Sequence, residues 1–348
     1  MKTVTEVSRS VPLRPLLTMF LPAAAAFLLT GGALDGLYSP WSLAVVSAAG
    51  VGWPGLSALL GAGLGAFLFL DFQAGLRHTA SAILIFCAAT AFCTTRLYRR
   101  PRFRPAAAVV MTLLVQSAYL FQRQPRQWTL CAAALTILWA AAALLPSLTD
   151  SSADGGTRQQ AGFLLALGLC LSAYGWEVSG FRMGGLLAAA LLLAAARRLT
   201  PAAAAAAGAV AGLVLDLYVG DTVLLTAVLS GAAAAASALQ RRGRLLSPLA
   251  FCAVAAAVYL LLDGPDLLPL LCQCIAGAGL YLLLPEHLLP RLAQRAASVS
   301  RSAPSREEAA TPAAAFRAVY DSFFTDTTPP RPEGPGRIRV SFKTVQVQ

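Results

Sequence analysis

The sequence predicts an all-α protein that crosses a membrane with many helices. Of its 348 residues, 57% are hydrophobic and only 12% are charged, and the mean hydropathy is +0.66. Soluble domains carry roughly 25% charged residues, so this chain has too few charges to cover a surface in water. Apolar runs of helix length alternate with short arginine clusters, and features of the first part of the chain return in the second. The lipid bilayer is therefore the expected surroundings.

Twelve apolar runs are candidate membrane spans. A bilayer core takes roughly 20 apolar residues per helix, with a lower limit of about 17. Two of the runs are shorter than this, so about 10–12 spans are expected. The runs are 13–32, 40–53, 54–70, 76–95, 105–121, 127–146, 160–176, 183–197, 202–219, 222–240, 245–262 and 267–284.

The arginine clusters predict the orientation of these spans. The net charge of +11 is placed between apolar runs, as the positive-inside rule requires, so no nucleic-acid partner is expected. With residues 1–12 in the cytoplasm, the inner side holds Arg96, Arg99, Arg100, Arg102, Arg104, Arg197, Arg198, Arg241, Arg242 and Arg244. The outer loops hold Asp35, Asp71, Glu177, Asp216, Asp221, Asp263 and Asp266, with Arg77, Arg123, Arg126 and Arg182 as their cations. The prediction is a multi-pass protein of the cell membrane with both termini cytoplasmic. Its outer carboxylates are expected in water, with a cation site as the alternative.

The chain also divides into two similar halves. A first membrane half, 13–146, is joined by a cytosolic linker, 147–159, to a second half, 160–284, and a cytosolic tail, 285–348, follows. Pro54, Gly61 and Gly65 return 147 residues later as Pro201, Gly208 and Gly212, and Asp71 and Arg96 return 145 residues later as Asp216 and Arg241. This correspondence predicts two parallel six-helix repeats. Chance similarity stays open, because alanine and glycine align easily.

The repeated glycines are the predicted helix-packing residues. Gly61 and Gly65, like Gly208 and Gly212, form a Gly-x-x-x-Gly pair within an apolar run. Glycines at this spacing let two helices approach closely in lipid, where dispersion contacts replace the hydrophobic drive. We expect equivalent contact faces in the two halves, either within one bundle or between copies of the chain, and a homo-oligomer stays open.

The spans show no pattern that indicates catalysis or metal binding. No Asp, Glu, Lys, Arg or His lies at the centre of a predicted span, which argues against a proton- or sodium-coupled carrier. A channel for an uncharged substrate stays open. The seven cysteines form no paired CxxC motif, and the histidines, His78 and His287, support no metal site. We therefore predict no catalytic residue, no cofactor and no metal site in this chain.

The tail contains one predicted helix. Residues 291–312 form a linker rich in Ser, Ala, Arg and Pro, and residues 313–324 can form a short amphipathic helix before a disordered end. Its apolar face consists of Phe316, Val319, Tyr320 and Phe323. Such a helix would couple the bundle to a cytosolic domain. Lying on the membrane surface is the alternative, which Asp321 and Asp326 disfavour.

Three segments carry a family resemblance: YSPWSLAVVSAAG, the glycine-rich span after Pro54, and AFRAVYDSFF…PPRPE. Together they resemble stage II sporulation protein E of endospore-forming bacteria over residues 15–335. The resemblance implies a polytopic membrane region, a central regulatory and oligomerising segment, and a manganese-dependent PPM-type serine/threonine phosphatase. It also implies a place at the asymmetric septum, an interaction with the tubulin-like division ring, and activation of a forespore sigma factor.

The end of the sequence departs from that family. After Glu333 the chain runs into RIRVSFKTVQVQ, where the family continues into a long cytosolic region. We expect a truncated or frameshifted gene, or a separately encoded phosphatase, with manganese only in that missing domain. The first hypothesis is a non-catalytic membrane anchor and scaffold. The alternatives are a small-molecule transporter or permease with 6+6 helix repeats, and an interaction protein unrelated to sporulation.

Overall fold

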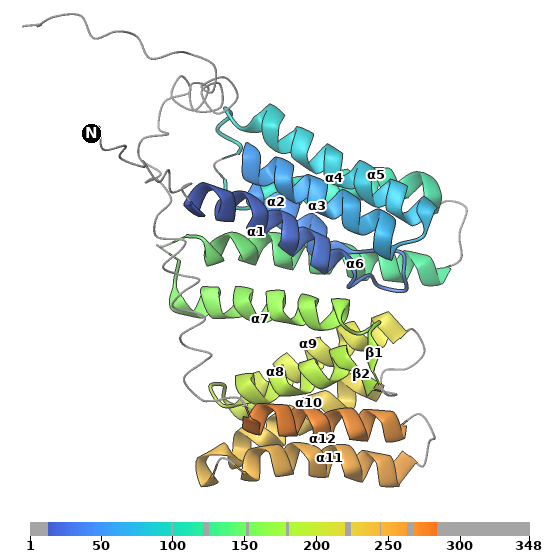
Figure 1. Ribbon diagram of the computed structural model, residues 1–348, viewed down its shortest axis with the longest axis vertical. Helices are drawn as coiled ribbons and strands as arrows, with labels where there is room; N and C mark the ends of the chain where they lie inside the picture. The colour runs from blue at the N-terminus through green and yellow to red at the C-terminus, as the bar shows by residue number, and fades with distance from the viewer. Residues whose placement is uncertain are drawn as a thin grey trace, which may run out of the picture. The chain divides into compact units, whose positions relative to one another are not determined.

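The computed structural model describes residues 13–98, 100–120, 125–150, 153–178, 181–219, 224–243, 245–262 and 267–283 (Figure 1). This part of the chain is helical, as predicted, and each of the twelve apolar runs holds one helix. The first six are α1 (Leu13–Thr30), α2 (Pro40–Ala49), α3 (Trp53–Phe69), α4 (Phe72–Phe92), α5 (Phe103–Leu120) and α6 (Pro125–Leu144), followed by the 3-10 helix η1 (Leu145–Leu148). The predicted helix at 313–324, with Phe316, Val319, Tyr320 and Phe323, lies outside the described residues.

The second half begins after η1. Its helices are α7 (Gly155–Ser172), α8 (Met183–Ala196), α9 (Pro201–Val219), α10 (Leu224–Leu239), α11 (Leu246–Leu262) and α12 (Leu267–Leu283), with the 3-10 helix η2 (Gln240–Arg242) after α10. A two-residue strand, β1 (Glu177–Val178), pairs antiparallel with β2 (Phe181–Arg182) just before α8.

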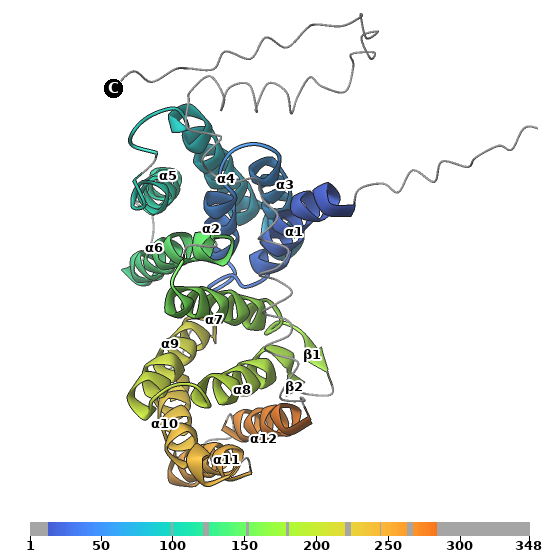
Figure 2. The same cartoon turned by 90° about the vertical axis from the view of Figure 1, so that its left-hand side faces the viewer.

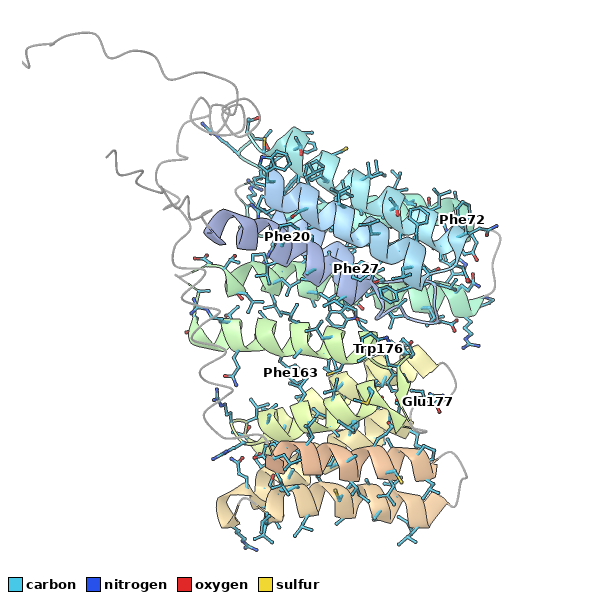
Figure 3. All side chains as sticks on the ribbon, viewed as in Figure 1. Phe20, Phe27, Phe72, Phe163, Trp176 and Glu177 are labelled. Carbon is cyan, nitrogen blue, oxygen red and sulfur yellow. The ribbon has the colours of Figure 1, made fainter. Side chains whose placement is uncertain are left out.

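The helices indicate a membrane protein. Four helical segments are long and apolar enough to cross a bilayer: Phe72–Phe92, Phe103–Leu120, Pro125–Leu148 and Pro201–Tyr218. Large apolar side chains also lie on the outside of the first half, where Phe20 is 67% and Phe72 is 72% exposed (Figure 3). In water such side chains would favour burial, whereas lipid solvates them.

A short helix lies at the centre of each half. α2 contacts α1, α3, α4, α5 and α6, and α8 contacts α7, α9, α10, α11 and α12 (Figure 2). α2 has 10 residues and α8 has 14. At 1.5 Å per residue these helices are about 15 Å and 21 Å long, shorter than the roughly 30 Å of a bilayer core. Both ends of α2 therefore fall inside the bundle or close to its rim.

The local sequence explains why α2 is short. Pro40 occupies its first turn, where a missing N–H costs nothing. The helix ends at Gly50, whose φ is 72°, and Gly52 follows with φ 85°. Left-handed backbone of this kind favours glycine, so the GVG segment stops one helix and lets the next begin at Trp53.

The two halves share one core. α7 contacts α1 and α6 of the first half as well as α8 and α9 of the second. At Gly168 of α7, an added Cβ would lie 2.7 Å from Leu29 Cδ2 and 3.1 Å from the Trp41 ring. The glycine therefore lets α7 approach α1 and α2 closely, which joins the buried residues of both halves into one cluster.

Candidate functional site

The predicted glycines of α3 lie against α1. A Cβ added at Gly61 would overlap the backbone carbonyl of Ala23, and one at Gly65 would lie 2.8 Å from the Phe27 carbonyl oxygen and 2.9 Å from Thr30 Cβ. Two of these neighbours are backbone atoms, which cannot rotate away. The α1–α3 contact is thus a backbone-to-backbone approach that only glycine allows at these positions.

The corresponding glycines of α9 have a different neighbour. At Gly208 an added Cβ would overlap the Leu229 carbonyl and lie 2.8 Å from Ser230 Cα, and at Gly212 it would lie 2.5 Å from the Leu225 carbonyl oxygen. These residues belong to α10, whereas the glycines of α3 face α1. Under the expected alignment of the halves, α10 corresponds to α4, so the two glycine pairs close different helix pairs.

Asp216 continues the glycine stripe of α9, four residues after Gly212. Its side chain is 6% exposed and accepts three hydrogen bonds, from Leu225 N at 3.0 Å, Thr226 N at 2.8 Å and Thr226 Oγ1 at 2.6 Å. The carboxylate thereby caps the N-terminus of α10, whose first N–H groups have no partner within their own helix. The expectation of a carboxylate in water is wrong for Asp216. The signal in the sequence was its place on the same helix face as Gly208 and Gly212.

A buried polar cluster surrounds the start of α2. Ser42 Oγ lies 3.0 Å from His78 Nε2, Ser39 Oγ lies 3.2 Å from Ser42 Oγ, and Ser39 donates to the Leu29 carbonyl at 3.2 Å. The three side chains are 0 to 3% exposed. These bonds tie α2 to α4 and to the end of α1, and they satisfy polar groups that could not be left unpaired in an apolar core.

A small, partly open pocket lies beside this cluster. Its lining includes Ser39 at the start of α2, His78 of α4, Thr112 and Gln116 of α5, and Cys131 and Ala134 of α6. It has room for about one water molecule. Gln116 is 4% exposed, and its Oε1 accepts a long hydrogen bond of 3.5 Å from Arg77 Nη1. The guanidinium of Arg77 also lies 3.6 Å from the centre of the Tyr119 ring.

The other end of α2 is also held by polar groups. Ser47 Oγ donates to the Arg104 carbonyl at 3.2 Å, and Arg104 Nη1 donates to the Ala48 carbonyl at 3.5 Å. A cation at a helix C-terminus is favourable because the helix dipole is negative there. Arg104 also lies over the ring of Tyr98, 4.6 Å from its centre. Both ends of this short helix are therefore fixed from neighbouring helices.

Sequence reasoning missed the pocket, although its residues follow a helical period. On α4 the buried face includes His78, Ser81, Ala82 and Ile85. On α5 the buried residues Ala108, Thr112 and Gln116 recur at every fourth position. Polar side chains on the small-residue face of a membrane helix point into the bundle. This pattern in the sequence could have indicated the pocket.

The described residues include no group of three or more His, Cys, Asp or Glu side chains that could hold a metal ion. All seven cysteines are free thiols, and His287 lies outside the described part of the chain. Comparison of the chain with protein-family models, curated proteins and solved structures finds no match.

Proposed function

We propose that this chain is a non-catalytic membrane anchor and scaffold, comparable to the membrane region of stage II sporulation protein E that its sequence resembles. The observation that carries the proposal is the close backbone contact between helices at Gly61, Gly65, Gly208 and Gly212. Contacts of this kind fix neighbouring helices in one arrangement. A carrier instead needs helices that move around a central site. A rigid bundle suits a protein that positions a partner at a membrane.

We also infer that the chain has 10–12 spans, arranged as two parallel six-helix repeats with both termini in the cytoplasm. Supporting this is the similar set of contacts in the two halves, since α2 touches the other five helices of its half and α8 does the same. The pairs α3–α4, α4–α5 and α5–α6 likewise recur as α9–α10, α10–α11 and α11–α12. The difference lies in α1, which packs extensively on α3, whereas α7 contacts α9 only slightly.

The location of the protein tests the anchor proposal. A fluorescent protein fused before Met1 of the full chain would be imaged in an endospore-forming bacterium during asymmetric division. We expect fluorescence concentrated at the asymmetric septum. Even fluorescence around the whole membrane would contradict a septal anchor. As a test of the non-catalytic part, the purified full chain with manganese should release no phosphate from a phosphoserine peptide above the level of a buffer blank.

The polar pocket favours one second candidate, a transporter or permease with 6+6 helix repeats. His78 and Gln116 bring two polar side chains into a buried space of the first half, which is where a solute pathway would need them. Liposomes containing the full chain would be tested for permeation by urea and glycerol, using light scattering after osmotic shock. Permeation faster than in empty liposomes would favour this candidate over the scaffold, and equal rates would exclude passage of these solutes.

A further inference from the structure

A cation lies beside the pocket at the start of α2, because Arg77 Nη1 donates a hydrogen bond to the pocket residue Gln116. The segment 72–149, which contains α4, α5 and α6, has no Asp or Glu, and another of its arginines, Arg104, lies at the opposite end of α2. Asp35 and Asp71 are both exposed, and neither lines the pocket. The N-terminus of α2 also points its positive dipole end toward this region. Every fixed charge contributed by the surrounding helices thus has the same sign.

The first turn of α2 has unused hydrogen-bond donors. Ser39 occupies the N-cap position, but its side chain makes no capping bond, because it bonds to Leu29 and Ser42 instead. The backbone N–H groups of Trp41 and Ser42 have no acceptor within the described part of the chain. A buried helix start without partners requires some other acceptor.

Two buried side chains of the pocket have unpaired nitrogens as well. Gln116 makes its hydrogen bond through Oε1, so its amide nitrogen has no partner among the described residues. His78 bonds to Ser42 through Nε2, and its second ring nitrogen is likewise without a described partner. The single hydrogen of Ser42 Oγ has three acceptors in reach, namely the Ser39 carbonyl, Ser39 Oγ and His78 Nε2, so His78 carries a second N–H donor only in the tautomer with its proton on Nδ1. The Gln116 amide therefore presents N–H donors at the pocket that it lines, and His78 adds another in that tautomer.

We propose that this pocket binds a single monatomic anion, and we take chloride as the probe. The amide donors of Gln116, the positive end of a buried helix and the absence of a lining carboxylate favour a negative charge. The small size of the pocket excludes a phosphate or a carboxylate-bearing metabolite. The site is distinct from the anchor role and does not depend on it.

Chloride-dependent stability of the full chain in nanodiscs tests the site. The unfolding midpoint would be measured in mixtures of sodium chloride and sodium gluconate at constant ionic strength, since an ion that binds only the folded state raises it. We expect a saturable rise with chloride. In the Gln116→Leu variant, which removes the amide donor at similar volume, the apparent chloride affinity should fall at least tenfold, as expected for loss of a hydrogen bond to a charged group.

The second half supplies the matched control, Gln273→Leu. Gln273 is a buried glutamine at 4% exposure, and its side chain contacts Gly185 in the first turn of α8, so this variant should keep the chloride response. A second pocket variant, Ala134→Val, fills the pocket without removing a donor and should also lose the stabilisation by chloride. It tests the site even if Gln116→Leu does not fold. An unresponsive natural chain would overturn the proposal, because water alone would then occupy the pocket. An equal response in the natural chain and both pocket variants would overturn it too, because it would be a general salt effect.

Discussion

The contact between α9 and α10 makes a sharp prediction about Gly208. In the Gly208→Ala variant, the new Cβ would overlap the Leu229 carbonyl and approach Ser230 Cα. Neither atom can rotate away, so the two helices must move apart. That movement also stretches the hydrogen bonds of Asp216 to Leu225 and Thr226, which are 2.6 to 3.0 Å long.

The size of the effect follows from two opposing terms. Alanine is favoured over glycine in a helix by about 1 kcal/mol. Overpacking costs typically about 1–3 kcal/mol, and the upper end applies because the obstruction is backbone. The net destabilisation expected for Gly208→Ala is therefore about 2 kcal/mol.

Gly279 of α12 provides a control of identical chemistry. A Cβ added at Gly279 would have no neighbouring atom within 4 Å. Gly279→Ala should therefore stabilise the chain by about 1 kcal/mol through the helix preference of alanine, with no overpacking cost. The free energies of unfolding of the two variants in the same nanodiscs should then differ by about 3 kcal/mol. This corresponds to unfolding midpoints on the order of 5 °C apart. Equal midpoints would refute the close backbone contact of α9 with α10.

Three further predictions concern the polar groups and the orientation. Asp216→Ala should destabilise the chain by about 2–3 kcal/mol, because it leaves the buried donors of α10 unpaired. Thr226→Val removes one of the three hydrogen bonds to Asp216 and should cost about 1 kcal/mol, measured by the same melting assay. Ser42→Ala should lower the free energy of unfolding by about 1–2 kcal/mol, because it leaves His78 Nε2 unpaired. The control Ser57→Ala removes a hydroxyl that bonds only to its own helix and should cost less. Similar losses of stability in the two variants would contradict a role for the Ser42–His78 bond. For the orientation, green fluorescent protein fused after Asp150 should fluoresce, and alkaline phosphatase fused after Glu177 should be active, with the opposite pattern contradicting a cytoplasmic N-terminus.

The helices could be predicted from the sequence, because apolar runs and the breaks between them define membrane helices directly. Pro40 and Pro201 begin helices, and Gly50 ends one, so boundaries agree within a few residues. The neighbours of each helix could not be predicted. Faces rich in alanine and glycine fit many partners, and hydrophobic patterning does not distinguish α1 from α10 as the helix that Gly61 or Gly208 will meet.

The polar groups were predicted less well, for a related reason. Asp216 lies near the end of an apolar run, where the sequence equally suits a carboxylate in water and one that caps another helix. Only the fold places the first turn of α10 against it. Likewise His78, Ser42 and Gln116 come from three separate helices, and their convergence depends on α2 lying at the centre of its half.

The two central helices solve one physical problem in different ways. A short helix buried in a bundle must have its free N–H groups satisfied by protein or by a ligand, because lipid offers no acceptor. At the start of α8, the side chain of Gln273 reaches Gly185 so closely that a Cβ there would overlap its Oε1. At the start of α2 lies a pocket whose lining includes Ser39, His78 and Gln116. At α8, Met183 N–H donates to the Trp176 carbonyl at 3.0 Å and a side chain covers the first turn, whereas the start of α2 leaves room for an acceptor that the described chain does not provide. The first half is therefore where a ligand of this protein should be sought.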